Sequence, residues 1–502
     1  MKTNTLDFDA QALREKILDL AMRGKLVPQD PNDEPASVLL EKIKAEKEQL
    51  IKEKKIKKSK PLAPITDDEK PFDIPDSWEW VRLADVGEII SGGTPKTSEK
   101  SYWENGNIPW ITPAIMSDTQ DDLIFNNKQI KFINKLGLEK SSAHLILKNS
   151  LVVSSRAPIG YVNIVPFDYT TNQGCKSVSL YSNTAKEFVY FALKNAVPDM
   201  IKRASGTTFK EISGTKFGQT IIPLPPLEEQ SRIAAKIAQL FALLRKVESS
   251  TQQYAKLQTL LKSKVLDLAM RGKLVEQDPH DEPASVLLER IKTEKEQLVK
   301  KGKIRKSKSL PPITEDEKLF NLPQGWTWVK LNDVLALENG AIRRGPFGSS
   351  LKKSFFVPKS EDTYKVYEQG NAINHTINYG SYYISYQKYE ELQSFSIRPG
   401  DIIISGAGTI GKTYILPSNS PKGVINQALI RVRLNEQLIS KEYFLFAFKQ
   451  KVGLINKQAK GTAIKNMFSV THMKNDLVWA LPPLAEQKRI TKKIQNILSF
   501  VK

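Results

Sequence analysis

The stretch LDLAMRGKLV occupies residues 18–27 and occurs again, unchanged, at residues 266–275. Aligning 17–80 with 265–328 leaves about seven positions in ten identical, which indicates an internal duplication. The similarity ends after SWEW (77–80) and GWTW (325–328), and it returns where LPPLEEQSRI (224–233) matches LPPLAEQKRI (481–490). Two nearly constant segments therefore alternate with two divergent segments of about 145 residues, a usual size for a domain.

The constant segments have the apolar spacing of long helices. Between 227 and 274, apolar residues alternate intervals of four and three, which keeps one seam toward a partner helix as in a coiled coil. No proline interrupts this stretch and Gly272 can end it, so we predict a helix roughly 70 Å long. A second helix is expected to begin near Asp281. The seam positions are Ile233, Ile237, Leu240, Leu244 and Val247.

The two ends of the chain carry the same helix in two pieces. The tail 484–502 matches the first half of the central helix, and residues 6–20 match its second half. A helix of about 20 residues is marginal on its own and needs packing partners. We therefore expect the chain ends to meet and complete a second rod, giving one chain an approximate two-fold symmetry.

The overall charge favours a polyanionic partner. The 502 residues include 75 lysines and arginines against 55 aspartates and glutamates, a formal net charge of +20. Nucleic acid is the default partner for such a field, and a solvated lysine-rich surface is the alternative. The single cysteine, Cys175, excludes an internal disulfide, and no apolar run is long enough to span a membrane. The N-terminus lacks a signal pattern, so we expect a cytoplasmic protein.

Residue chemistry proposes DNA contacts in the first divergent segment. The Gly/Pro-rich loop SGGTPKTSEKSYW (91–103) offers hydroxyls and lysines suited to phosphates. An arginine after the strand-like LVVSS (151–155) can meet guanine O6 and N7. KRASGTTFK (202–210), which matches KQAKGTAIK (457–465), is a plausible phosphate clamp. Ordinary surface loops and salt bridges are the alternative. The candidates are Thr94, Lys96, Lys100, Arg156, Lys202, Arg203, Thr207 and Lys210.

The second divergent segment offers its own basic and amide-rich loops. GAIRRGPFGSSLKK (340–353) places arginines between glycines, which can approach a groove closely. NAINHTINYG (371–380) supplies asparagines, which pair well with the edge of adenine. Polar turns between strands are the alternative. The candidates are Arg343, Arg344, Lys352, Asn371, His375, Lys412, Lys457, Lys460, Thr462 and Lys465.

Several catalytic signals are absent or misleading. GAGTIGKT (406–413) satisfies the phosphate-loop pattern, but a strand-like TYILPS follows where a phosphate loop requires a helix, so we predict strand, turn and strand. The four histidines have no ligand spacing, so no metal site is proposed. We find no motif of an adenine methyltransferase and no convincing cofactor loop.

The repeated frame resembles a known family. The helix entries LPPLEEQ and LPPLAEQ, the domain entries SWEWVRLADV and GWTWVKLNDV, and SGGTPKTSEKSYWENGNIPWI are similar to the DNA-specificity (S) subunits of type I restriction–modification systems. The resemblance covers essentially the whole chain. It implies an α+β fold with two mixed α/β target-recognition domains, separated by two long antiparallel, coiled-coil-like conserved regions with pseudo-two-fold symmetry. The expected segments are 1–75 (N-terminal helical region and basic linker), 76–223 (first recognition domain), 224–323 (central helical hairpin and basic linker), 324–480 (second recognition domain) and 481–502 (C-terminal helix pairing with the N-terminal helix).

The resemblance implies a non-catalytic subunit that binds double-stranded DNA. Each recognition domain would read one half of an asymmetric bipartite sequence, at a spacing set by the helical rods. The implied partners are two copies of a methyltransferase (modification) subunit, with restriction subunits in the full complex. No cofactor is expected in this chain, because S-adenosylmethionine, ATP and Mg belong to the partner subunits. The competing classes are a structural adaptor whose two globules bind proteins, and a stand-alone nuclease or methyltransferase.

Overall fold

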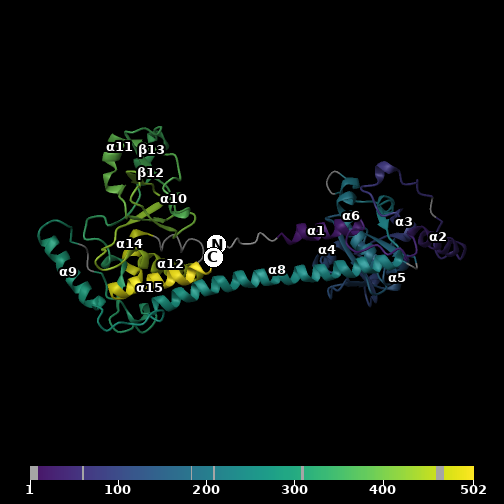
Figure 1. Cartoon of the computed structure of the whole chain (residues 1–502), viewed down its shortest axis with the longest axis horizontal. Coiled ribbons are helices and arrows are strands. Elements are labelled where there is room, and N and C mark those ends of the chain that lie inside the picture. The colour runs from purple at the N-terminus through teal and green to yellow at the C-terminus, as the bar shows by residue number, and fades with distance from the viewer. Residues whose placement is uncertain are drawn as a thin grey trace. The chain divides into compact units, whose positions relative to one another are not determined.

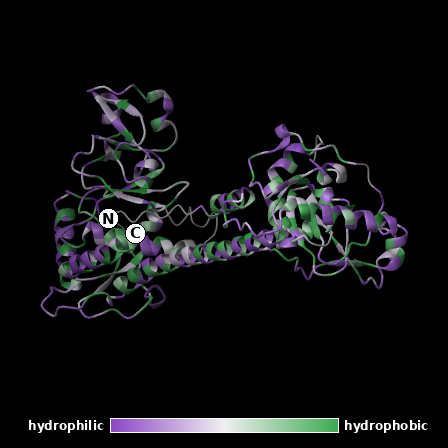
Figure 2. Ribbon diagram, turned by 45° about the vertical axis from the view of Figure 1, so that its right-hand side comes forward, coloured by the Kyte–Doolittle hydropathy of each residue, from purple (hydrophilic) through white to green (hydrophobic). Residues whose placement is uncertain are grey.

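A computed structural model of the chain describes residues 9–58, 61–181, 184–206, 210–306, 310–458 and 469–501. The chain divides into two compact units, Met1–Gln252 and Gln253–Lys502 (Figure 1). In each unit, hydrophobic residues gather in the strands and adjoining helices, and hydrophilic residues prevail in the outlying loops (Figure 2). Among the described helices, none is both long and apolar enough to cross a membrane.

The predicted long helix is present as α8 (Leu227–Met270), which is 44 residues and about 66 Å long. It ends two residues before Gly272, as the sequence predicts. Its first part belongs to the first unit and its second part to the second unit. The helix α9 (Ala284–Lys300) follows it and begins after Pro283, three residues later than predicted. In the first unit the equivalents are α1 (Ala10–Met22) and α2 (Ala36–Lys52).

The repeated decapeptide ends α1 and α8 in the same way. Gly24 and Gly272 have φ of +65° and +66°, a left-handed conformation that glycine adopts without strain. The N–H of the following lysine donates to the carbonyl of Leu20 at 2.9 Å, or of Leu268 at 2.8 Å, which closes the usual glycine-terminated helix end. A Cβ on either glycine would meet the ring of a proline, Pro75 or Pro323, at 2.5 and 2.4 Å. The ten residues are therefore repeated because they build the same helix end against the same proline loop.

Each unit contains one half of α8 and the terminal helix that repeats the sequence of the other half. In the first unit, Arg14 of α1 donates to Glu248 of α8 at 2.6 Å, while Gln29, after α1, donates to Glu229 near the start of α8 at 2.5 Å, so the two helices run antiparallel. In the second unit, α15 (Leu484–Ser499) shares a hydrophobic core with the second half of α8. The predicted antiparallel pairing is thus confirmed within the first unit. The meeting of the chain ends and the two-fold relation between the units remain predictions.

Between its helices, the first unit holds the first domain, our name for residues 76–223. Its central sheet has the strand order β2 (Gly87–Ser91), β8 (Cys175–Leu180), β5 (Leu151–Ser155) and β6 (Ile159–Ile164). A second sheet has the order β4 (Lys131–Ile133), β3 (Ile108–Ile111) and β7 (Thr170–Thr171). The entering strand β1 (Glu79–Arg82) pairs with the leaving strand β9 (Ile221–Leu224), so the two ends of the domain lie side by side. The helices are α3 (Leu83–Val86), α4 (Pro113–Met116), α5 (Lys135–Glu139), α6 (Lys186–Arg203), which packs on β6, and α7 (Gly214–Gly218).

The second domain, our name for residues 324–480, repeats this plan. Its central sheet has the order β11 (Ile342–Arg344), β18 (Leu429–Val432), β15 (Ile402–Ser405) and β16 (Thr413–Ile415). Its second sheet has the order β13 (Tyr383–Ser385), β12 (Thr363–Tyr367), β17 (Gly423–Ile425) and β14 (Ser396–Ile397). Strands β10 (Thr327–Lys330) and β19 (Val478–Leu481) pair at its two ends. Among its described residues, the helices are α10 (Gln369–Ile373), α11 (Tyr386–Glu391), α12 (Lys441–Gln458) and α14 (Val470–Asp476). The α+β class is confirmed, and the finer division of the chain into five segments remains a prediction.

Candidate nucleic-acid interface

A hairpin of the same design closes the central sheet of each domain. In the first domain the Oγ of Ser154 accepts a hydrogen bond from the N–H of Tyr161 at 2.8 Å. In the second, the Oγ of Ser405 accepts from the N–H of Lys412 at 2.9 Å. The latter hairpin is the GAGTIGKT segment, and β16 follows it where a phosphate loop requires a helix. The predicted strand–turn–strand is confirmed.

The first hairpin carries Arg156, whose side chain is 36% exposed. Its guanidinium lies 3.7 Å from the carboxylate of Glu211. The buried Lys176 also reaches Glu211, at 3.4 Å, and donates to the Oγ of Ser155 at 3.2 Å. One carboxylate therefore faces two cations, and Arg156 is the one that retains access to solvent.

The Gly/Pro-rich loop after β2 rests on two tryptophans. The indole N–H of Trp110 donates to the carbonyl of Gly93 at 3.1 Å, and Trp103 packs edge-on against Trp110 with ring centroids 5.1 Å apart. The lysines of this loop, Lys96 and Lys100, are exposed. The structure thus provides both a rigid support for the loop and two cations at its surface.

The candidates after α6 differ in their availability. The guanidinium of Arg203 donates to the carbonyl of Lys216 at 2.5 Å and to Thr220 Oγ1 at 2.9 Å, so it braces the chain within the domain. Lys202 and Lys210 are exposed. In the corresponding segment of the second domain, Lys457 belongs to α12. Thr207, Lys460, Thr462 and Lys465 lie outside the described residues.

The paired arginines of the second domain are half-buried and stack on aromatic rings. Arg344 lies over Phe347 at 5.2 Å, and its Nε donates to the carbonyl of Gln427 at 3.1 Å. Arg343 lies over Phe395 at 5.4 Å. Stacking holds a planar guanidinium in place, as contact with a groove would require. Two further candidates, Lys352 and Lys412, are exposed.

The two candidates in NAINHTINYG (371–380) differ in their exposure to solvent. Asn371 is buried, its Oδ1 accepts from the N–H of Glu368 at 2.8 Å, and its amide donates to the carbonyl of Thr376 at 2.9 Å. Its amide is thus engaged inside the domain, where it shapes the loop, and its contact with a base stays a prediction. His375 is exposed, with its ring 6.0 Å from that of Tyr414.

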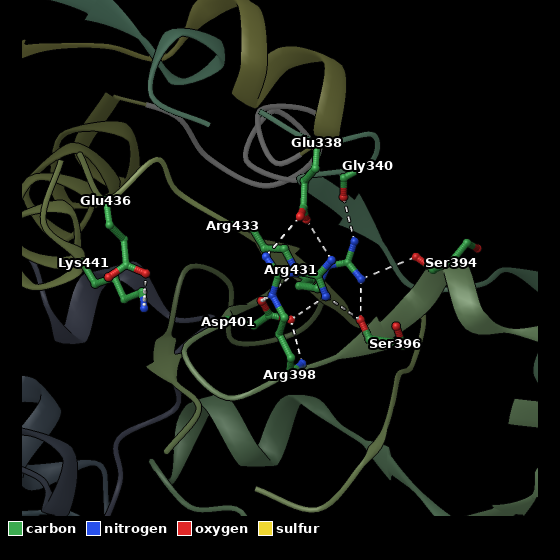
Figure 3. A network of polar contacts seen from close by, with 10 residues as sticks. All are labelled: Glu338, Gly340, Ser394, Ser396, Arg398, Asp401, Arg431, Arg433, Glu436 and Lys441. Atoms are coloured by element: carbon green, nitrogen blue, oxygen red, sulfur yellow. Dashed lines mark hydrogen bonds and ion pairs between the residues drawn. The ribbon is translucent and has the colours of Figure 1, made fainter. Parts of the chain in front are cut away.

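A buried charge network supports the second domain (Figure 3). Arg433, directly after β18, contacts Asp401 at 2.7 Å and Glu338 at 2.9 Å. Arg431 donates to the carbonyl of Gly340 at 2.7 Å, and burial, reinforced by Arg433, lowers its pKa to about 10. Counting from the Asn-Gln dipeptides at 172 and 426, the first domain has Ser177 and Ser179 where the second has Arg431 and Arg433, so the network distinguishes the second domain from the first.

Sequence reasoning missed a turn that is the same in both domains. This Asn-Gln turn, residues 172–174 and 426–428, connects the second sheet to the central sheet. Its asparagine Oδ1 accepts from the N–H two residues later at 3.0 Å in both domains. Its glutamine, Gln173 or Gln427, is exposed. The only sequence signal was the dipeptide NQ, which is too short to stand out between divergent segments.

A glycine allows the neighbouring loop to pass close to each Asn-Gln turn. A Cβ added to Gly92 would meet the carbonyl oxygen of Asn172 at 2.0 Å. A Cβ added to Gly345 would meet the carbonyl oxygen of Asn426 at the same distance, 2.0 Å. The loop after β2 or β11, the Asn-Gln turn and the hairpin therefore converge at one end of each domain, and this end is the candidate interface.

Comparisons with known proteins agree with the resemblance seen in the sequence. The family model described as "Type I restriction modification DNA specificity domain" matches residues 75–258 and 323–501. The type I restriction enzyme EcoAI specificity subunit of Escherichia coli is 31% identical over 98% of this chain and 89% of its own length. The EcoEI specificity subunit of the same species is 30% identical over 97% of this chain and 89% of its own length.

A solved structure supports the fold. The HsdS subunit from Thermoanaerobacter tengcongensis superimposes with a TM-score of 0.50 at 18% identity, covering 86% of this chain and 92% of its own. At this identity the likeness concerns the fold alone.

Proposed function

Since this chain belongs to the type I restriction–modification DNA specificity subunits and serves in DNA recognition, we propose that its two domains read the two halves of one asymmetric, bipartite target. The chain itself is non-catalytic in this proposal. Two copies of a methyltransferase subunit bind it and methylate an adenine in each half-site, and restriction subunits join them to cut DNA.

One observation carries the proposal: the two domains share a frame and differ in the side chains that the frame presents. Counting from Ser154 and Ser405, Arg156 of the first hairpin stands where the second has Ala407. Counting from Gly92 and Gly345, a threonine in the first domain stands where the second has Phe347. Equivalent backbones with unlike side chains suit two reading domains with different sequence preferences.

The helix α8 is a suitable spacer, because it passes without interruption from one unit into the other. One turn of B-DNA is roughly 34 Å, so a rod of about 66 Å has the scale of a target with two separated halves. The net charge of +20 supplies the attraction to phosphates that such binding needs.

The test is to express the chain with its methyltransferase partner in a host that lacks N6-methyladenine, and to map methylated adenines by sequencing. We expect one asymmetric motif with two defined halves and a fixed gap. The purified complex should bind that motif more tightly than a scrambled duplex, and its affinity should fall steeply with salt. A continuous or palindromic motif would contradict the two-domain reading. A complex that binds proteins but shows no preference among duplexes would favour an adaptor instead.

A further inference from the structure

The Asn-Gln turn is built from the same contacts in both domains. The N–H of Asn172 donates to the carbonyl of Ile111 at 3.0 Å, and the N–H of Asn426 donates to the carbonyl of Tyr367 at 2.9 Å. The N–H three residues further along donates back to the asparagine carbonyl, at 3.1 Å in the first domain and 3.0 Å in the second. Together with the asparagine Oδ1 bond, three contacts recur, although most surrounding residues differ.

These contacts leave the glutamine side chain as the exposed polar group of the turn. Three backbone N–H groups of each turn donate inside the domain, so they do not form the cradle of free N–H groups that phosphates favour. Gln173 and Gln427 are exposed. A primary amide offers one acceptor and one donor group side by side, which matches N6 and N7 of adenine.

The surroundings of the turn suit DNA. In the first domain, a Cβ on Gly174 would lie 3.2 Å from the Nε of Arg156, so this arginine borders the turn. The hydroxyl of Thr94 donates to the Oε1 of Gln173, which orients the amide and leaves one lone pair of that oxygen available. In the second domain, Arg344 borders the turn by its bond to the Gln427 carbonyl.

A residue shared by two domains that read different sequences should contact something that their half-sites have in common. Under the proposed function, on which this inference rests, each half-site contains an adenine that the same methyltransferase modifies. We propose that Gln173 and Gln427 each contact the target adenine of their half-site through its N6 and N7 edge in the initial complex. Arg156, Arg344 and the divergent loops then read the flanking bases.

The experiment measures the affinity of the complex of this chain with its methyltransferase subunits, without S-adenosylmethionine, for the mapped target. One duplex is natural, and two others carry 7-deazaadenine, which lacks the N7 acceptor, at the target adenine of one half-site. The analogue should weaken binding by the wild type about tenfold in either half-site. The complex with Gln173→Ala should bind natural DNA about tenfold more weakly than the wild type does. Its affinity should not fall further when the analogue occupies the half-site read by the first domain. Gln427→Ala should likewise make binding insensitive to the analogue in the half-site read by the second domain.

The matched controls are Gln129→Ala and Gln437→Ala, which remove exposed glutamines of the same domains that lie outside the turn in the sequence. Both should keep the wild-type affinity and sensitivity to the analogue. A milder variant is Thr94→Val, which removes the hydroxyl that orients Gln173. It should reduce the effect of the analogue on binding in the half-site read by the first domain and leave the other half-site unaffected. This result would distinguish a positioning role from loss of the fold.

Three outcomes would overturn the inference. In the first, both glutamine variants bind DNA as tightly as the wild type. In the second, the loss of affinity caused by each variant adds to the loss caused by the analogue in both half-sites. In the third, the methyltransferase subunit is lost from the purified complex. The last would identify the turn as a docking point for the partner. If the wild-type complex does not prefer its target over a scrambled duplex, the proposed function fails before any variant is tested.

Discussion

The indole N–H of Trp78 donates to the carboxylate of Glu229 at 2.9 Å, and this bond ties the entry of the first domain to the start of α8. The second unit repeats it between Trp326 and Glu486 at 2.8 Å. The second oxygen of each glutamate accepts from a glutamine amide after the repeated decapeptide. The same three residue types thus join rod to domain in both units.

Removing this carboxylate should destabilise one unit at a time. Glu229→Ala leaves the buried indole N–H of Trp78 without its acceptor, at a cost of about 1–3 kcal/mol, and also removes one bond of the exposed Gln29. Denaturant unfolding of the variant should show earlier loss of structure in the first unit. The control Glu228→Ala, one residue away and exposed, should leave the transition unchanged. Equal stability of both variants would show that the bond does not hold the domain to the rod.

The same carboxylate makes a prediction about pH. Burial raises the pKa of Glu229 above its usual 4.5. Between the unfolded and the folded pKa the native state holds more protons, so the free energy of unfolding should fall as pH rises through that window. Glu229→Gln should flatten this part of the profile, measured by denaturant titrations from pH 4 to about pH 7. An unchanged slope in the variant would assign the pH dependence to other groups.

The charge network of the second domain should be sensitive to loss of its acidic partner. Asp401 is 2% exposed and pairs with Arg433, so Asp401→Ala leaves a largely buried guanidinium without that partner. Breaking a buried pair from one side costs about 3–5 kcal/mol. Limited proteolysis should then cut the second unit first. The control is Glu436→Ala, which breaks the more exposed pair with Lys441 and should cost about 1 kcal/mol or less.

Shortening α8 should change the gap in the target without changing its two halves. Deleting residues 249–255 shortens the rod by about 10 Å, the length of about three base pairs, and nearly preserves the rotational phase of the helix. Methylation mapping should reveal the same half-sequences at a new gap, or no methylation. Seven alanines in place of these residues keep the length and should keep the motif. Methylation of the unchanged motif by the deletion variant would refute the role of the rod.

A single exposed lysine should contribute through charge. If Lys412 contacts a phosphate, Lys412→Ala should weaken binding to all duplexes alike and lower the slope of log affinity against log salt by about 0.9. The control Lys292→Ala removes a lysine that pairs with Glu289 on α9 and should leave the slope unchanged. Loss of preference between sequences, with an unchanged slope, would instead assign Lys412 to base reading.

The helical frame could be predicted because its signals are local and repeated. The seam of α8 and Gly272 as the helix end act through backbone geometry that the sequence displays directly. The start of the next helix was predicted near Asp281, three residues too early, because Pro283 stands immediately before α9. The hairpin at 406–413 was predictable for the same reason, since the residues after Lys412 cannot readily continue as a helix.

The interface was less predictable because its geometry depends on residues distant in sequence. The burial of Asn371 follows from its bonds to the surrounding loop, and the chemistry of asparagine does not distinguish that role from base reading. The bonds of Arg203 to Lys216 and Thr220 likewise depend on the fold and leave no trace in the local sequence. The Asn-Gln turns escaped notice because only the fold aligns Gln173 with Gln427.

The boundary between the units, at Gln252–Gln253, falls inside α8, whose two halves recur at the chain ends. A genetic crossover at this point would transfer one complete unit, that is, one domain together with its part of α8 and the terminal helix of that unit. If each domain reads one half-site, as proposed, the recombinant protein would combine one half-site from each parent, without any compensating mutation elsewhere. Under the proposed function, one exchange at this point would therefore be enough to produce a new target.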